Sequence, residues 1–205
     1  AGWQSGYAAA CKAVYSGSIP DSASIFDMKK NKALFLDRDG VINHNYGYVH
    51  KVNDFDFIDG IFELVRKANE KNYLVIIVTN QAGIGRGYYY EKDFLNLMKW
   101  AIGVFKINGT HIDDIFFCPF HPTHGIGVYK KDSYLRKPNP GMILEASKKH
   151  DINLKKSIMI GDNISDIQAG SSAGIGLNIL YTSNNLKTKE INSIRKLIDA
   201  KKYLV

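Results

Sequence analysis

Apolar and polar residues occur along this chain in blocks that predict a regular succession of strands and helices. Short apolar runs of the kind found in buried strands occupy residues 33–36, 73–78, 114–118, 157–160 and 176–181. Longer segments of helical character occupy residues 60–72, 91–106, 141–150 and 164–173, and a terminal helix is predicted near 187–201. In the first of these, apolar residues recur at helical spacing, namely Ile61, Leu64, Val65 and Ala68.

Strands that alternate with helices indicate the α/β fold class. We expect a Rossmann-like parallel sheet with helices on both faces, because each crossover connection must pack back onto the sheet. Residues 31–205 are predicted to form this domain, whereas residues 1–30 read as an appended segment or linker of unclear origin. Two long irregular stretches, 43–59 and 119–139, interrupt the alternation. Loops of this length are usually functional, so we expect them to shape a substrate pocket.

Composition indicates the class of protein and its expected cellular location. Hydrophobic residues make up 45% and charged residues 23% of the 205 residues, as in an ordinary globular domain. No apolar run approaches the roughly 20 residues that cross a bilayer, so we expect no membrane partner. Residues 1–15 lack a basic head followed by an apolar stretch, which predicts no secretory signal. The two cysteines, Cys11 and Cys118, suggest no disulfide framework, and a cytoplasmic location is the simplest expectation.

The net charge of +7 bears on the kind of partner. The lysines are scattered in pairs and form no continuous basic block, so we do not expect nucleic acid as a partner. A basic surface that attracts small phosphorylated substrates is equally compatible with this charge. A monomer is the expected state.

The strongest chemical signal is a pair of aspartates that directly follows the first predicted strand. Asp37 and Asp39 stand two residues apart, and the chain can turn at once at Gly40. Open α/β sheets place their reacting groups at the carboxyl ends of their strands. The two carboxylates can therefore converge on one site, as a nucleophile beside an acid/base or as a metal pair.

Two later segments bring donors and cations to the same edge. Thr79 ends the second predicted strand, where its hydroxyl can hold a phosphate, and the backbone N–H groups of Asn80 and Gln81 could help to cradle an anion. Arg136 and Lys137 stand before a predicted helix on a segment that prolines stiffen. The arginine can grip phosphate oxygens in a bidentate manner, while the lysine supplies a compact charge.

A further pair of aspartates follows the fourth predicted strand. Asp162 comes directly after Gly161 and is predicted as a metal ligand. Asp166 lies one helical turn further on, as an orienting partner for Lys137 or a metal-bound water, or simply as a first-turn acid. Carboxylates with room for water suit Mg²⁺. A metal and a lysine beside a nucleophilic carboxylate form an arrangement for phosphoryl transfer.

The order of these motifs resembles that of the haloacid dehalogenase-like (HAD-like) phosphatases. Within that family the chain is most similar to the branch of heptose bisphosphate 7-phosphatases, whose sister group is the histidinol-phosphate phosphatases. The matching motifs span residues 32–181 and agree in order and spacing; they lie at 37–43, 47–50, 57–60, 79–87, 118–122 and 136–142. The resemblance implies a fold without a large cap domain, so that loops must build the pocket.

The resemblance also implies roles for individual residues. Asp37 would form an aspartyl-phosphate, and Asp39 would act as acid and then base. Thr79 and Lys137 would hold the phosphoryl group, with Mg²⁺ on Asp37, the Asp39 carbonyl and Asp162. The substrate would be a small phosphorylated sugar, a heptose 1,7-bisphosphate on the way to a nucleotide-activated heptose. Further substrate contacts would come from Asn80 and from four loop residues: Asn43, His50, Arg86 and Arg136.

The chain departs from the family in the loop that commonly holds a structural zinc. Of the four ligand positions only Cys118 is kept, because Phe120, Ser133 and Leu135 occupy the other three. One ligand cannot close a tetrahedral site, so no structural zinc is expected. A site rebuilt from Cys118, His121 and His124 is the alternative to a zinc-free loop held by aromatic packing.

Three alternatives to a heptose bisphosphate phosphatase remain. A histidinol-phosphate phosphatase would need an added acidic residue near the loops to accept a cationic amine. A phosphatase of nucleic-acid ends is supported by the basic charge alone. A non-catalytic module of a fused protein is suggested by residues 1–30, but the intact set of polar residues at the strand ends argues against it.

Overall fold

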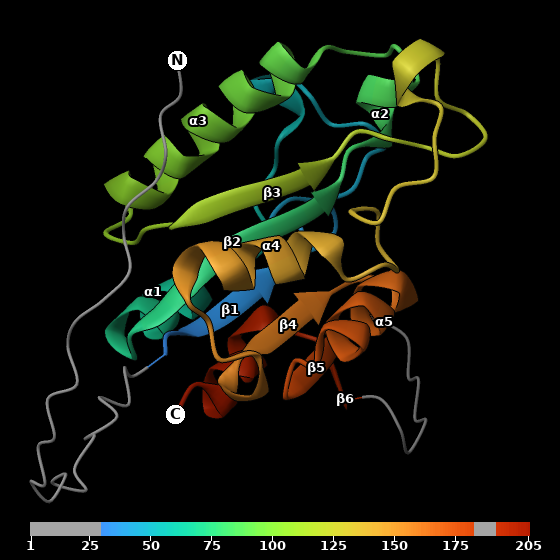
Figure 1. Ribbon diagram of the computed structural model, residues 1–205. Helices are drawn as coiled ribbons and strands as arrows, with labels where there is room; N and C mark the ends of the chain where they lie inside the picture. The colour runs from blue at the N-terminus through green and yellow to red at the C-terminus, as the bar shows by residue number, and fades with distance from the viewer. Residues whose placement is uncertain (1–29, 183–191) are drawn as a thin grey trace, which may run out of the picture.

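The computed structural model describes residues 30–182 and 192–205, and the strands in these ranges form a single sheet (Figure 1). The sheet has the order β3-β2-β1-β4-β5-β6, and every pairing is parallel. Its strands are β1 (Lys32–Leu36), β2 (Tyr73–Asn80), β3 (Asp114–Cys118), β4 (Ile158–Gly161), β5 (Leu177–Tyr181) and β6 (Asn192–Ile194). The expected Rossmann-like α/β class is confirmed.

Helices cover both faces of the sheet (Figure 1). The α-helices are α1 (Ile61–Glu70), α2 (Ala82–Gly85), α3 (Glu91–Ile107), α4 (Gly141–His150) and α5 (Ile164–Ala173). The short 3₁₀ segments are η1 (Val52–Asp54), η2 (Gly127–Tyr129), η3 (Leu154–Lys156) and η4 (Leu197–Tyr203). Helices α1 and α3 pack with η4 on one face, and α4 and α5 lie on the other. The described residues include no separate cap domain.

The central strands β1 and β4 are apolar because both of their faces are buried. In β1, Leu34 and Leu36 join the core under α1 and α3, while Ala33 and Phe35 join the core under α4 and α5. All four side chains are fully buried. The continuous apolar run of β1 thus fixes it in the middle of the sheet.

The strand order reverses at β1, because the strands before β4 in the sequence lie on one side of it and the later strands lie on the other. Strand β1 pairs with β2 on one side and with β4 on the other, and β3 and β5 continue outward from these two. In open α/β sheets such a switch in strand order leaves a crevice at the carboxyl ends of the strands. The residues after β1, β2 and β4 are therefore those that the fold brings to a ligand site.

The predicted terminal helix near 187–201 is wrong for the part that the structure describes. Residues Asn192–Ile194 form β6, which pairs with β5, and Leu197–Tyr203 form a 3₁₀ helix against α1. Pairing along the sheet edge and burial of Leu197 and Ala200 decide this segment, and neither is visible in local helix propensity. Residues 187–191, and residues 1–29 of the appended segment predicted at 1–30, lie outside the described residues. Within the described ranges, no helix has the length and apolarity that a membrane span requires.

Candidate active site

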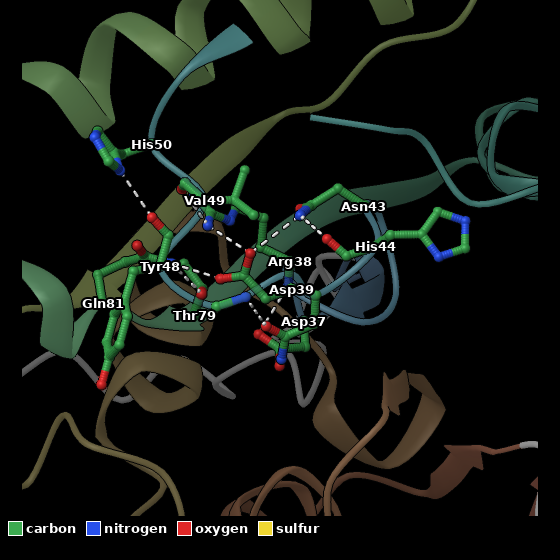
Figure 2. A network of polar contacts seen from close by, with 12 residues as sticks. Asp37, Arg38, Asp39, Asn43, His44, Tyr48, Val49, His50, Thr79 and Gln81 are labelled. Carbon is green, nitrogen blue, oxygen red and sulfur yellow. Dashed lines mark hydrogen bonds and ion pairs between the residues drawn. The ribbon is translucent and has the colours of Figure 1, made fainter. Parts of the chain in front are cut away.

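Side chains from neighbouring strand ends meet at the carboxyl edge of the sheet. Asp37 follows β1, Thr79 lies near the end of β2 and Asp162 follows β4, so the strand order places them together. Lys137 reaches the same place from the loop before α4. With Asp39, these residues line an open cavity of about 470 Å³. Figure 2 shows Asp37, Asp39 and Thr79 gathered at this point.

The ammonium group of Lys137 is the buried centre of the arrangement. Its Nζ lies 2.8 Å from Asp37 Oδ1 and 2.6 Å from Asp166 Oδ1, and it donates to the Val78 carbonyl at 2.8 Å. The three N–H donors of the ammonium are thereby matched with three acceptors. The Asn80 side chain bonds the backbone of Lys137 as well. Lys137 is thus fixed at both its backbone and its charged end.

Burial and neighbouring charges shift the protonation of this cluster. Burial raises the pKa of Asp37 from 3.8 to about 7, against the opposing effect of Lys137, and the charge of Asp166 adds to the rise. Burial and then the charge of Asp166 raise the pKa of Asp162 from 3.8 to about 6. Burial alone would lower the pKa of Lys137, but Asp37 and Asp166 raise it. The lysine therefore stays cationic, while Asp37 and Asp162 have too little positive charge nearby to offset their burial.

This shortage of positive charge is what a bound divalent cation would relieve. Carboxylate oxygens of Asp37, Asp162 and Asp166 lie within 4.8 Å of one another, the one such group of potential ligands among the described residues. Both oxygens of Asp166 are already bonded, one to Lys137 and one to the Asn163 N–H. Asp37 and Asp162 therefore remain as carboxylate ligands, and hard oxygens of this kind fit Mg²⁺.

Glycine at position 40 lets Asp162 approach the loop after β1. Gly40 has a positive φ of 89°, which favours glycine. A Cβ atom at this position would lie 1.9 Å from Asp162 Oδ2. The D-x-D-G sequence thus provides both the carboxylates and the space into which the acidic group after β4 fits.

The Asp39 carboxylate is held by three donors from two segments, the loop after β1 and the end of β2. Arg38 Nη2 donates to Oδ1, Asn43 Nδ2 donates to the same oxygen at 3.1 Å, and Gln81 Nε2 donates to Oδ2 at 3.1 Å. Figure 2 shows these groups around Asp39. Arg38 is fully buried and also donates to the Val49 carbonyl. A carboxylate fixed in this way has one orientation toward the cavity.

The structure corrects the expected anion cradle after β2. The Gln81 N–H donates to the Cys118 carbonyl at 2.8 Å and is therefore occupied within the fold. The Gln81 side chain instead enters the site, where Nε2 donates to Thr79 Oγ1 at 2.9 Å as well as to Asp39. Asn80 lines the cavity, but both ends of its amide are bonded to Lys137.

Two arginines lie at or near the cavity: Arg136 lines it, and Arg86 contacts the lining residue Tyr48. Arg136 lines the cavity and donates to the Phe120 carbonyl at 3.2 Å. Burial lowers the pKa of Arg136, and the charge of Arg86 acts in the same direction. Arg86 lies over the Tyr48 ring, 5.7 Å from its centre, and its buried Nε has no hydrogen-bond partner. Among the described residues, neither guanidinium forms an ion pair with a carboxylate.

Two expected substrate contacts lie behind the cavity wall. Asn43 is fully buried and bonds Asp39 and the His44 carbonyl. His50 Nδ1 lies 2.8 Å from the Tyr48 carbonyl, and its ring stacks on Tyr89. The geometry thus places Asn43 and His50 as supports of residues that line the cavity.

The loop before α4 is held by packing and hydrogen bonds. Cys118, His121 and His124 do not converge as a ligand group in the described part of the chain. His121 Nδ1 instead accepts from the backbone N–H of Thr123 and of His124. Within the same loop, the Phe120 and Tyr129 rings lie 6.0 Å apart and Lys131 lies over Phe120, 3.9 Å from the ring centre.

Sequence reasoning missed the roles of Arg38 and Tyr89 in this site. Arg38 carries a signal in retrospect, because an arginine between two aspartates at a buried strand end must find partners nearby. Tyr89 carries no local signal. It lies in a run of tyrosines, Tyr88 to Tyr90, of which it alone is buried.

Comparisons with known proteins agree with this architecture. The family described as HAD-hydrolase-like matches residues 134–201. The D-glycero-alpha-D-manno-heptose-1,7-bisphosphate 7-phosphatase of Burkholderia mallei is 59% identical over 151 residues, 74% of this chain and 80% of that protein. The D-glycero-beta-D-manno-heptose-1,7-bisphosphate 7-phosphatase of Vibrio cholerae is 42% identical over 166 residues, 81% of this chain and 89% of that protein.

A solved structure shares the fold. The D,D-heptose 1,7-bisphosphate phosphatase from B. bronchiseptica, complexed with magnesium and phosphate, superimposes with a TM-score of 0.73 at 24% identity, over 84% of this chain and 97% of that one. The fold, the site and these relatives define a HAD-like phosphatase, which confirms the expected class. More narrowly, the chain belongs to the family of heptose-1,7-bisphosphate 7-phosphatases.

Proposed function

We propose that the protein removes the 7-phosphate of D-glycero-D-manno-heptose 1,7-bisphosphate, as a Mg²⁺-dependent cytoplasmic monomer in nucleotide-heptose biosynthesis. The observation that carries this proposal is the Lys137 ammonium between Asp37 and Asp166 at the strand edge, in a chain 59% identical to a named heptose bisphosphate phosphatase. A cation fixed beside a carboxylate suits the transfer of a phosphoryl group to that carboxylate.

Asp37 acts as the nucleophile in this proposal. Its carboxylate oxygen bonds to phosphorus while the bond from phosphorus to the sugar oxygen breaks, which leaves an aspartyl-phosphate. Asp39 lines the same cavity and gives its proton to the departing sugar oxygen. Asp39 then takes a proton from the water that attacks phosphorus, and inorganic phosphate leaves as Asp37 is restored.

Lys137 and Thr79 hold the phosphoryl group during both steps. The ammonium of Lys137 is buried and fixed by three acceptors, so it presents its charge without reorganisation. Asp37, Asp162 and the Asp39 backbone carbonyl would hold Mg²⁺. Bound there, the ion supplies the positive charge that lets an anionic aspartate approach an anionic phosphate.

The second phosphate of the substrate has candidate partners in Arg86 and Arg136. Neither guanidinium is paired with a carboxylate in the described residues, and Arg136 lines the cavity. Guanidinium groups bind phosphate oxygens in a bidentate manner. The open cavity of about 470 Å³ leaves room for a sugar between this side and Lys137.

The relatives favour the alpha anomer. The relative named for the alpha anomer is 59% identical, against 42% for the one named for the beta anomer. We therefore propose the alpha anomer as the preferred substrate. Histidinol phosphate fits less well, because the carboxylates on the cavity wall all belong to the cluster around Lys137 and Asp39.

The test is phosphate release from both heptose anomers and from histidinol phosphate, in Mg²⁺ and then in EDTA. We expect Mg²⁺-dependent turnover that favours the alpha anomer, and none by Lys137→Ala. A preference for the beta anomer would overturn the anomer assignment only. Turnover of histidinol phosphate instead would move the protein to the sister activity, and inactivity on all three substrates would contradict a phosphatase of this class.

A further inference from the structure

The side-chain amide of Gln81 bonds both Asp39 and Thr79. Gln81 Nε2 donates to Asp39 Oδ2 at 3.1 Å and to Thr79 Oγ1 at 2.9 Å. Gln81 itself is 1% exposed, so water does not compete for these hydrogens. In the proposed function, Asp39 serves the departing sugar oxygen and Thr79 serves the phosphoryl group. The orientation of the Gln81 amide therefore affects both Asp39 and Thr79.

The orientation of the Gln81 amide is fixed from the other side by Tyr89. The Tyr89 hydroxyl donates to Gln81 Oε1 at 2.6 Å. A hydroxyl that donates must meet the amide oxygen, so the carbonyl end of Gln81 faces Tyr89 and its amine end faces Asp39 and Thr79. Burial raises the pKa of Tyr89 to about 12, which keeps its hydroxyl protonated.

The Tyr89 ring is restrained by close packing against Gly83 and His50. A Cβ atom on Gly83 would lie 2.3 Å from Tyr89 Cε1, so the glycine makes the space for the ring. The His50 ring stacks on the Tyr89 ring, with centroids 4.8 Å apart and planes 6° apart. The Tyr89 side chain is 6% exposed. The Tyr89 hydroxyl is thus a restrained donor, although the residue lies in the loop between α2 and α3.

The bond from Gln81 also determines what Thr79 can do. An amide N–H only donates, so Thr79 Oγ1 is the acceptor in this bond. The hydroxyl hydrogen of Thr79 is then not used by Gln81 and can be donated into the cavity that Thr79 lines. This is the direction in which a phosphoryl oxygen would accept it.

We propose that Gln81, clamped by Tyr89, is a positioning residue for the reaction. It holds the Asp39 carboxylate toward the departing oxygen and directs the Thr79 hydroxyl hydrogen at the phosphoryl group. This inference rests on the proposed phosphatase function and adds to it a role for residues outside the reacting set. Tyr89 acts through Gln81, since it is to Gln81 that its hydroxyl is bonded.

Substrates with different leaving groups distinguish a positioning role of Gln81 from a purely structural role. A sugar alkoxide needs a proton as it departs, and positioned acid catalysis contributes about 10²–10⁴-fold. A p-nitrophenolate leaves without that proton, so its release depends little on the orientation of Asp39. A defect in Gln81 or Tyr89 is therefore expected to slow a sugar phosphate more than p-nitrophenyl phosphate.

The experiment compares Tyr89→Phe, Gln81→Met and the double variant with the parent protein on heptose 1,7-bisphosphate and p-nitrophenyl phosphate. Tyr89→Phe keeps the ring that packs on Gly83 and His50, and removes only the hydroxyl. We expect it to lower kcat on the sugar phosphate by about 3–10-fold, with KM nearly unchanged and a smaller loss on the aryl ester. The double variant should be no slower than Gln81→Met, because Tyr89 acts through Gln81. Tyr88→Phe, a change at an exposed neighbour, is the matched control.

Three results would overturn the inference: unchanged kcat in Tyr89→Phe, equal losses on both substrates, or additive losses in the double variant. A parent protein inactive on heptose 1,7-bisphosphate but active on p-nitrophenyl phosphate would contradict the proposed substrate alone, and the Gln81 clamp is then decided by a readout that needs no turnover. The ¹H–¹⁵N spectrum of the side-chain amides gives an independent readout without turnover. The Gln81 resonances should move in Tyr89→Phe and stay in Tyr88→Phe; unmoved resonances in Tyr89→Phe would contradict the clamp.

Discussion

Asn80 holds Lys137 by its backbone through a pair of hydrogen bonds. The Asn80 amide donates to the Lys137 carbonyl at 3.0 Å, and its own carbonyl accepts from the Lys137 N–H at 3.1 Å. Because Asn80 is the last residue of β2, this clasp ties a loop residue to the rigid sheet. The Lys137 backbone is thereby anchored to the strand, while Asp37, Asp166 and the Val78 carbonyl hold its ammonium group.

Asn80→Ala should therefore impair catalysis more than folding. Without the clasp, the Lys137 backbone can shift, and misplacement of a reacting group by about 1 Å costs roughly 10²-fold. We expect kcat/KM to fall by about 10–100-fold and the free energy of unfolding to fall by about 1–3 kcal/mol. Steady-state kinetics and urea unfolding of the same preparation check both numbers.

Asn69 offers a matched control for this variant. Its amide makes the same pair of bonds to the backbone of His111, at 3.2 Å and 2.9 Å, away from the cavity residues. Asn69→Ala should lower stability without lowering kcat/KM. If both variants lost activity to the same extent, the effect of Asn80 would be one of general stability.

Asp37→Asn should abolish turnover and leave the fold intact. The amide cannot form an aspartyl-phosphate, so phosphate release should fall to background. Burial and the charge of Asp166 already raise the pKa of Asp37, so loss of its negative charge should not lower the melting temperature. Phosphate assays measure the turnover and thermal melts measure the stability. Turnover by Asp37→Asn at the parental rate would exclude Asp37 as the nucleophile.

Gly40→Ala should weaken Mg²⁺ binding through Asp162. The new Cβ would lie 1.9 Å from Asp162 Oδ2, so the carboxylate must move. Gly174 has a similar φ of 85° but has no atoms within 4 Å of its built Cβ, so Gly174→Ala shares the backbone strain alone. Each variant should lose about 1–2 kcal/mol of stability. Only Gly40→Ala should need more Mg²⁺ for half-maximal activity, and an equal requirement in both variants would contradict the contact.

The stabilising effect of Mg²⁺ should grow with pH. The pKa values of Asp37 and Asp162 are about 7 and about 6 in the folded protein, against 3.8 for an ordinary aspartate. As pH rises from about 4 to about 7, the folded state holds more protons than the unfolded state, so the metal-free protein loses stability. Mg²⁺ binds the ionised carboxylates and should restore it.

Thermal melts in Mg²⁺ and in EDTA, between about pH 5 and about pH 8, measure this linkage. The difference between the two melting temperatures should widen toward high pH, and Asp162→Asn should reduce it. A difference that narrows as pH rises would be inconsistent with a cation held by Asp37 and Asp162.

The sequence allowed the strand ends to be predicted well, because they combine two local signals. An apolar run followed at once by a polar residue marks both the end of a buried strand and a side chain at the sheet edge. Asp37, Thr79 and Asp162 each follow or close such a run, and the structure brings all three to one cavity. Lys137 was predicted from a different signal, its position before a helix on a segment that prolines stiffen.

Contacts between distant segments could not be predicted in this way. The Gln81 N–H was available as an anion donor on local grounds, but β3 supplies the Cys118 carbonyl that occupies it. Tyr89 reaches Gln81 only because Gly83 has no side chain, a relation that no periodicity records. The predicted terminal helix failed for the same reason, since its described part is decided by pairing with β5.

The bonds around Lys137 join residues that are synthesised at different times. The ammonium joins Asp37 after β1, Val78 in β2 and Asp166 in α5, which are spread over most of the domain. As the ribosome adds residues from the amino end, both aspartates of the D-x-D-G segment emerge about 100 residues before their lysine and about 130 before Asp166. The nascent chain therefore carries its nucleophile before it can use it, and activity appears only after Lys137 and Asp166 have been added.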